Sequence, residues 1–232
     1  MITLHHLNNS RSQRILWLME ELDIPYQIKF YQRDAKTMLA PPALKAVHPL
    51  GKSPVITDDG NPLGHDYGQV TLAESAAIID YLVKTYANGR LIPAENTRER
   101  IRYDYWMHYA EGSAMPPLVM KLIFKQIPKQ KMPFFVRPIA QKITERVLGT
   151  YIDPQLKLHL DYLSNELQPS GWFVGNEFSA ADIQLSFPLE AASQRTTLKQ
   201  DYPKLVDFLK RIHARPAYQR ALQKGGAYAY AK

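Results

Sequence analysis

The sequence predicts a small α/β domain followed by an all-helical domain. Strand and helix patterns follow the order β-α-β-α-β-β-α over about the first 87 residues, and strand signals disappear from Asn96 onward. The charge changes near the same place: residues 1–90 carry nine basic and nine acidic side chains, and the rest of the chain holds the whole formal charge of +7. A chain of 232 residues is long enough for two cores. We therefore expect domains at 1–87 and 96–232, joined by a linker at 88–95.

The α/β domain is expected to begin with a strand and an amphipathic helix. Residues 2–7 (ITLHHL) have the pattern of a short strand, and a polar turn follows at 8–10. The segment RILWLMEEL then places apolar side chains at offsets of 0, 3, 4 and 7, which is the stripe of an amphipathic helix: Ile15, Leu18, Met19 and Leu22. Asp23-Ile24-Pro25 ends this helix, and the alternating segment 26–31 predicts a second strand.

The rest of this domain contains one ambiguous segment and several clearly predicted elements. Residues 36–47 are ambiguous, because Pro41 and Pro42 interrupt any helix there. The remaining elements are expected in chain order as follows: a strand at 54–57, a turn at Asp59-Gly60, a polar loop at 61–68, a strand at 69–72 and a helix over about 74–87.

Beyond the linker the pattern is helical. Helices are expected at about 97–124, 135–167, 180–193, 203–213 and 216–223. The segment Ser179-Ala180-Ala181-Asp182 has the form of a capping box, with an acid three residues after the capping serine. We interpret it as structural, and its loss should destabilise the fold by roughly 1 kcal/mol.

Composition excludes several kinds of site. The chain has no cysteine, which rules out a disulfide scaffold, an iron–sulfur cluster, a redox CxxC pair and a cysteine nucleophile. The seven histidines lack metal-ligand spacing, and we expect no metal. Neither a GxxxxGK[ST] nor a GxGxxG phosphate loop is present. The first residues lack the pattern of a secretory signal and no apolar run is long enough to span a bilayer, so we expect a cytoplasmic protein with no membrane contact.

The positive charge is concentrated in one segment. Residues 121–146 carry seven basic side chains against Glu145 alone, which is +6 of the +7. Such a run is either a solvated helix–loop–helix face or a patch that binds polyanions. We favour the solvated face and expect no nucleic-acid partner.

Three positions in the α/β domain could bind a ligand or could simply be structural. Ser10 lies where the first helix begins, so its hydroxyl could donate to a bound anion or could cap the helix, as could Asn9 or Ser12. Pro54 opens a strand, and it is either a cis proline that exposes a peptide-binding edge or an ordinary edge proline. Glu74-Ser75 could clamp an amino-acid-like group or could only cap the next helix.

Aromatic side chains crowd the first helix after the linker. They form either buried core or the wall of an apolar cleft: Tyr103, Tyr105, Trp106, Tyr109 and Met115.

Taken together, these pieces resemble a glutathione S-transferase over essentially the whole chain. The matching segments occur in the family's order: Ser10 with Arg14, then HPLGKSPVI, then LAESAAIIDYLVKTY, then WFVGNEFSAADI. The serine-type bacterial and fungal branch is most similar, and the lack of cysteine separates the chain from the cysteine-type enzymes. The resemblance implies a thioredoxin-like domain, a helical-bundle domain that carries the electrophile pocket, and a homodimer.

The resemblance also implies roles for individual residues. Ser10 matches the serine that donates a hydrogen bond to the glutathione thiolate. The other glutathione contacts are expected from Asn9, Lys52, Ser53, a cis-Pro54, Glu74, Ser75 and, toward the partner subunit's ligand, Asp104. The electrophile pocket is expected at Tyr105, His108, Tyr109 and Met115. Two departures stand out: Ser53 occupies a position where the family often has a branched aliphatic residue, and Asn9 could assist or replace Ser10.

The implied function is a glutathione transferase. Glutathione would be the co-substrate, and its thiolate would attack an apolar electrophile, with a glutathione-dependent peroxidase reaction as a further activity. The alternative is a non-catalytic binding or assembly module of the same fold.

Overall fold

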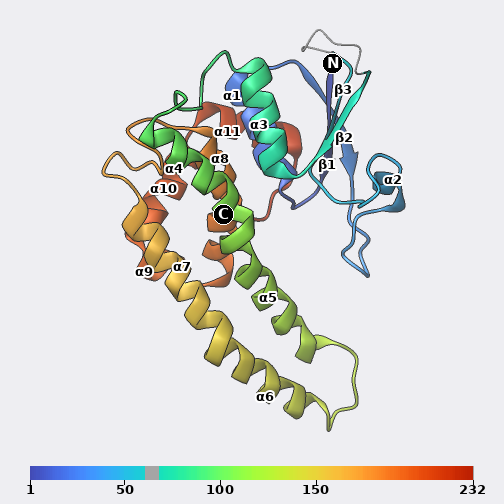
Figure 1. The fold of residues 1–232 in the computed structure, drawn as a ribbon. Helices are drawn as coiled ribbons and strands as arrows, with labels where there is room; N and C mark the ends of the chain where they lie inside the picture. Colours follow the sequence, from blue (N-terminus) through green and yellow to red (C-terminus); the bar gives the residue numbers. More distant parts are fainter. Residues whose placement is uncertain (61–67, 232) are drawn as a thin grey trace.

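The computed structural model describes residues 1–60 and 68–231 and has the two-part architecture predicted from the sequence (Figure 1). The α/β part is built on a four-stranded sheet in the order β2-β1-β3-β4. The strands are β1 (Ile2–Leu7), β2 (Tyr26–Tyr31), β3 (Val55–Asp58) and β4 (Val70–Ala73). β1 runs parallel to β2 and antiparallel to β3, and β4 is antiparallel to β3. This is a thioredoxin-like arrangement, as expected.

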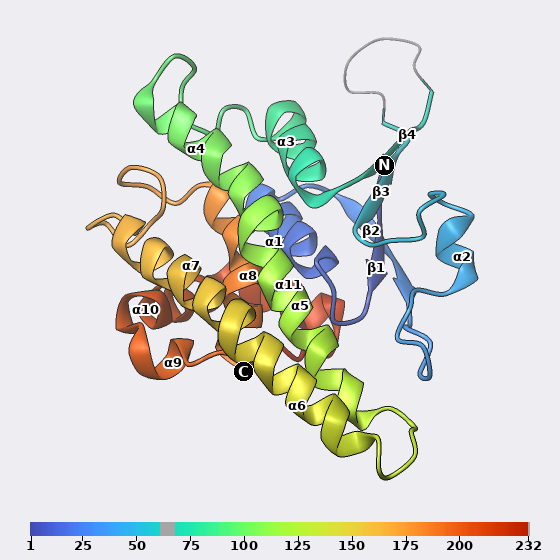
Figure 2. The same ribbon diagram turned by 60° about the horizontal axis from the view of Figure 1, so that its bottom comes forward.

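Helices cover both faces of the sheet. α1 (Ser12–Leu22) and α3 (Ser75–Tyr86) pack on the face that looks toward the helical part, whereas the short α2 (Pro42–Lys45) lies on the other side (Figure 2). Successive strand residues point to opposite faces, so Leu4 joins the core under α1, while Leu7 packs with Leu44 of α2. The ambiguous segment 36–47 therefore contains one helical turn, which begins at Pro42.

Two long, interrupted helices dominate the helical part. The first comprises α4 (Arg98–Tyr109), a π-helical turn and α5 (Met115–Gln126), and the second comprises α6 (Arg137–Val147), a π-helical turn and α7 (Asp153–Glu166). They run side by side as a hairpin whose α5–α6 end projects beyond the rest of the molecule (Figures 1 and 2). A 3-10 turn at Ile127–Lys129 follows α5.

The remaining helices bring the end of the chain back to its beginning. They are α8 (Ala180–Arg195), α9 (Leu198–Asp201), α10 (Pro203–His213) and α11 (Pro216–Gly225). The Trp17 ring of α1 meets the Tyr218 ring of α11 edge to face at 5.1 Å, and Arg215 donates to both carboxylate oxygens of Glu21 at 2.6 and 2.9 Å. A single buried core therefore runs from the sheet through α1 into the helical part.

The predicted elements agree with the structure apart from their ends. The strands expected at 54–57 and 69–72 each begin one residue later, and the loop expected at 61–68 lies, apart from Gly68, outside the described residues. The capping box is confirmed, because the Asp182 carboxylate accepts from Ser179 N at 2.8 Å and also from Phe173 N at 2.9 Å. The structure adds α9, which the sequence pattern did not predict. No helix in the described ranges is both long and apolar enough to cross a membrane.

Candidate functional site

Ser10 lies in the loop between β1 and α1. Only 4% of its surface is exposed. Its Oγ accepts a hydrogen bond from Ser12 N at 3.2 Å, so one lone pair supports the first turn of α1. The hydroxyl hydrogen is not used in that bond and can be donated to another group. The capping role and the ligand-binding role therefore use different parts of the same hydroxyl.

A short chain of hydroxyl groups connects Ser10 to a buried histidine. Ser10 Oγ lies 2.8 Å from Ser12 Oγ, which lies 3.0 Å from His6 Nδ1. Burial lowers the pKa of His6 to about 4, although a hydrogen bond to the Gly225 backbone raises it in part. The ring is therefore neutral near pH 7, and its Nδ1 can accept the Ser12 hydroxyl hydrogen, for which the Leu7 carbonyl at 3.3 Å is a second acceptor. His6 was given no role from the sequence.

A second hydroxyl faces Ser10 from the start of β3. Ser53 Oγ lies 3.3 Å from Ser10 Oγ and donates to the carbonyl of His5 at 3.3 Å. The Ser53-Pro54 peptide bond is cis, as the resemblance implies. Lys52, next to it, is exposed. The structure thus brings Ser10 and the cis-proline segment together.

A buried arginine one helical turn after Ser10 joins both parts of the molecule. Arg14 is 2% exposed and donates to Ser75 Oγ at 2.5 Å and to the Gln184 carbonyl at 2.6 Å. It also pairs with Glu111, just after α4, which accepts two further bonds at 2.9 Å from Arg11 Nε. Burial alone would raise the pKa of the Glu111 carboxyl, but the two arginines hold it below its usual value.

Glu74 and Ser75 stand at the N-terminus of α3. Ser75 is buried and accepts from Arg14, so its own hydroxyl hydrogen remains free to donate. Glu74 is exposed and has φ 68° and ψ 122°, an unusual backbone conformation for a residue other than glycine. Such conformations cost about 1–3 kcal/mol and are concentrated at functional sites. The pair could hold an amino group and a carboxylate of one ligand.

The C-terminal tail lies against the Ser10 loop. Ala229 N donates to Asn9 Oδ1 at 2.8 Å, and Tyr228 Oη donates to Glu190 at 2.5 Å. Tyr230 packs against the Phe187 ring at 5.3 Å, and the guanidinium of Arg11 lies 5.0 Å from that same ring. The tail thus adds two half-buried tyrosines beside the loop, and it uses the side-chain oxygen of Asn9 while leaving the Asn9 amide hydrogens as possible donors.

The residues predicted for the electrophile pocket differ in their exposure and in the side chains that they contact. Tyr105 stacks on Tyr109 at 5.6 Å, and Tyr109 Oη lies 2.6 Å from Nδ1 of His159 on α7. His108 is exposed and Met115 is buried. The ring contacts of the two tyrosines therefore lie on the α7 side of α4. This arrangement matches the buried-core interpretation of the aromatic cluster for Tyr103, Trp106 and Tyr109.

Asp104, which was predicted to reach the partner subunit's ligand, is half exposed. Its carboxylate pairs with Arg100 at 3.2 Å, one turn earlier on α4. Its predicted role needs a second subunit and stays a prediction.

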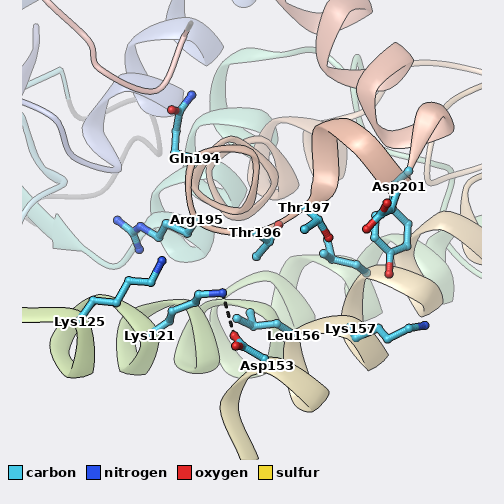
Figure 3. A pocket seen from close by; sticks show the side chains of 12 residues that line it. Lys121, Lys125, Asp153, Leu156, Lys157, Gln194, Arg195, Thr196, Thr197 and Asp201 are labelled. Atoms are coloured by element: carbon cyan, nitrogen blue, oxygen red, sulfur yellow. Dashed lines mark hydrogen bonds and ion pairs between the residues drawn. The ribbon is translucent and has the colours of Figure 1, made fainter. Parts of the chain in front are cut away.

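A separate cavity of about 530 Å³ opens between α5, α7 and the end of α8 (Figure 3). Lys125 and Arg195 enter it from opposite sides, and Lys121 pairs with Asp153 at 2.7 Å. Arg195 donates hydrogen bonds to the Tyr230 hydroxyl at 2.9 Å and to the Leu118 carbonyl at 3.3 Å. The residues that line this cavity do not include Ser10, Ser53 or Glu74, so it is distinct from the candidate site.

The described residues contain no group of three or more metal-ligating side chains. The site offers hydroxyl groups, a helix N-terminus, a carboxylate, the buried Arg14 and the partly exposed Arg11. Four contributors were missed from the sequence: His6, Arg11, Glu111 and Tyr228. Arg11 and Glu111 are a hundred residues apart, so no spacing could have paired them.

Comparisons with known proteins find similar sequences and structures. The family profile described as "Glutathione S-transferase, N-terminal domain" matches residues 10–85, and "Glutathione S-transferase, C-terminal domain" matches residues 126–225. The chain is 37% identical to glutathione S-transferase 3 of Schizosaccharomyces pombe, over 97% of this chain and 88% of that protein. It is 32% identical to glutathione S-transferase 1 of Saccharomyces cerevisiae, over 98% and 96%. A glutathione S-transferase from Actinobacillus pleuropneumoniae has a similar crystal structure, with a TM-score of 0.80, 35% identity and coverage of 100% and 96%.

Proposed function

The chain belongs to the glutathione S-transferase family, and from that membership we propose that Ser10 activates the thiol of bound glutathione, as in the serine-type branch, for attack on apolar electrophiles. The single observation that carries the proposal is the state of the Ser10 hydroxyl. Its oxygen accepts from Ser12 N, so its hydrogen is available to a thiolate.

The physical problem at such a site is to keep a thiol ionised at neutral pH. A free thiol has a pKa of about 8.5, so only a few per cent is thiolate near pH 7. In this structure the Ser10 hydrogen can reach two neutral oxygens, those of Ser12 and Ser53. A thiolate is a charged acceptor and forms a stronger hydrogen bond than either neutral oxygen. The N-terminus of α1 adds a favourable field for the anion.

The rest of the glutathione molecule would be held by residues of the first domain. We assign the cysteinyl backbone to Ser53 beside Pro54, the γ-glutamyl group to Glu74 and Ser75, and the glycyl carboxylate to Lys52. In this proposal, residues 1–87 bind glutathione and residues 96–232 supply the electrophile pocket. Asp104 would reach the glutathione of the second subunit in a cytoplasmic homodimer.

We place the electrophile between Ser10 and the tyrosines of the tail. Tyr228 and Tyr230 are half-buried and adjoin the Asn9–Arg11 segment through the Ala229 hydrogen bond. Of the residues first expected to form this pocket, Tyr105 and Tyr109 contact α7 and Met115 is buried. An apolar pocket wall suits halides, enones and organic peroxides. With a peroxide, the thiolate would attack one oxygen and break the O–O bond, which releases an alcohol and leaves a sulfenic acid on glutathione; a second glutathione would convert it to the disulfide and water.

Affinity for glutathione and turnover together test the proposal. The protein should be retained on immobilised glutathione and should conjugate a chromogenic electrophile at a rate that depends on both substrates. Retention without turnover across aryl halides, enones and peroxides would instead favour a non-catalytic binding module. The Asn9→Ala variant should keep most of its activity.

A further inference from the structure

The α5–α6 end of the long hairpin, here called the hairpin tip (residues 121–146), carries charge and apolar surface that the proposed function does not use. Its outer end projects beyond the sheet and the other helices in both views (Figures 1 and 2). Six of its seven cations have no acidic partner within 4 Å among the described residues, since only Lys121 forms such a pair, with Asp153. The tip is therefore a strongly positive projection.

Large apolar side chains are exposed on the same projection. Phe134 is 86% exposed and Phe135 is 64% exposed, and the two rings touch edge to face at 5.6 Å. Further exposed apolar residues flank them on both helices: Leu122, Ile123, Ile127, Ile139 and Ile143. Soluble proteins seldom expose contiguous apolar surface without a partner for it.

Two apolar and two basic side chains of α6 share one side of the helix, whereas Arg137 lies on the opposite side. At about 100° per residue, Ile139, Ile143, Lys142 and Arg146 fall within an arc of about 100°. The opposite side packs inward, where Thr144 is buried. A helix with apolar residues beside Lys and Arg, next to an exposed pair of phenylalanines, has the features of a segment that lies at a lipid–water interface.

We infer that the hairpin tip is a peripheral docking site for anionic lipid bilayers. Phe134 and Phe135 enter the headgroup region, and the surrounding lysines and arginines contact lipid phosphates. This docking departs from the expectation, drawn from the sequence, of no membrane contact, and it requires no helix that spans the membrane. It goes beyond the proposed conjugation reaction and uses none of the site residues, and it would bring the enzyme to the phase in which apolar electrophiles dissolve.

Charge and chemistry favour lipid over the other occupants. Two copies of the tip facing each other would place +6 against +6, which opposes self-association through this surface. Nucleic acid would match the charge but would leave the exposed isoleucines of α5 and α6 in water. An anionic bilayer satisfies both the charge and the apolar surface.

The test is sedimentation of the intact protein with vesicles of phosphatidylcholine alone or with added phosphatidylserine. We expect binding to the anionic vesicles only, weakening as salt is raised. Phe134→Ser with Phe135→Ser should weaken binding at least tenfold, whereas Phe134→Trp with Phe135→Trp should preserve it. Lys129→Glu with Lys131→Glu should abolish binding, and the same charge change at Lys204 and Lys210 on α10 should affect it much less.

The controls separate this inference from the proposed function. Conjugation of glutathione in solution should be unchanged in all tip variants, which also shows that they fold. Several outcomes would overturn the inference: no binding to anionic vesicles at low salt, equal loss with the α10 variant, or full binding after Phe→Ser. A change of oligomeric state in the Phe→Ser variant would identify the tip as a contact between subunits, and tight binding of DNA unaffected by Phe→Ser would identify a nucleic-acid surface. Either result would also overturn it.

Discussion

Ser12 Oγ lies 3.0 Å from His6 Nδ1 and 3.3 Å from the Leu7 carbonyl, so the Ser12 hydroxyl hydrogen has acceptors other than Ser10. With its hydrogen directed to either of these acceptors, the Ser12 hydroxyl offers only lone pairs to Ser10. Ser10 therefore remains the donor of the pair, and it can turn that hydrogen toward a ligand.

The first prediction concerns Ser10 itself. Ser10→Ala removes the donor but leaves the glutathione clamp intact, so glutathione should still bind. We expect the pKa of the bound thiol to rise by about one unit or more, which is about 1.4 kcal/mol per unit. The measurement is the ultraviolet absorbance of the thiolate as a function of pH, together with the pH–rate profile. An unchanged profile would remove Ser10 as the activator and would make Asn9 the suspect.

The second prediction concerns Ser12. Ser12→Ala leaves the buried His6 Nδ1 without a partner, which should cost about 1–2 kcal/mol of folding free energy. It also frees Ser10 from its neutral partner, so the thiol pKa should change by less than in Ser10→Ala. Urea unfolding and thiolate titration of the same sample would measure both effects. A thiol pKa shift as large as that of Ser10→Ala would show that Ser12, and not Ser10, is the principal donor.

The third prediction is a pH dependence of stability. The pKa of His6 is about 4 in the folded chain and about 6.5 when unfolded. Between these values the unfolded chain binds a proton that the folded chain does not, so stability falls as pH falls from about 6.5 to about 4. His6→Asn should make this slope shallower, by up to about 1.4 kcal/mol per pH unit. Urea unfolding at several pH values measures the slope, and identical slopes for the two proteins would contradict the prediction.

The fourth prediction concerns the pair of Arg14 and Glu111. Glu111→Gln leaves a buried guanidinium without its countercharge and should destabilise the protein by about 2–3 kcal/mol. Arg14 also donates to Ser75, which we assign to the γ-glutamyl group. The KM for glutathione should therefore rise in Glu111→Gln as well. Arg14→Met with Glu111→Met should cost less than the two single changes added together. Strict additivity in this double-mutant cycle would show that the pair is not coupled.

The fifth prediction separates stability from binding at Glu74. Glu74→Gly relieves an unusual backbone conformation, since φ is 68°, while it removes the carboxylate. The melting temperature should stay the same or rise, and the KM for glutathione should increase tenfold or more with little change in kcat. Glu74→Gln is the matched control: it should weaken glutathione to a similar degree without the gain in stability.

Local patterns predicted most of the fold. The stripe of Ile15, Leu18, Met19 and Leu22 specifies α1, and the Ser179–Asp182 box specifies the start of α8, because both signals lie within one or two helical turns. α9 spans four residues, which is too short for a hydrophobic period to be visible. Strand ends depend on pairing with a neighbouring strand, and a single segment does not contain that information.

The site was predictable only in part, for a similar reason. Ser10, Ser53 and Ser75 occur in recognisable segments, but their partners come from elsewhere in the chain. Arg14 meets Glu111 across 97 residues, and the spacing of Tyr105 and Tyr109 shows that they share a helix face without showing that α7 covers it. Long-range pairing of this kind follows from packing rather than from sequence pattern.

The contact between the tail and the Ser10 loop has a consequence for how the protein is made. Ala229 N donates to the Asn9 side chain, although the two residues are 220 positions apart in the chain, and α11 packs on α1. During synthesis, the surface of α1 that contacts α11 therefore stays exposed until α11 has been made. The N-terminal domain emerges early but keeps an apolar face open, so a nascent chain that stalls before α11 should bind chaperones or aggregate. Maturation of the site is thus tied to the synthesis of α11 and the segment that follows it.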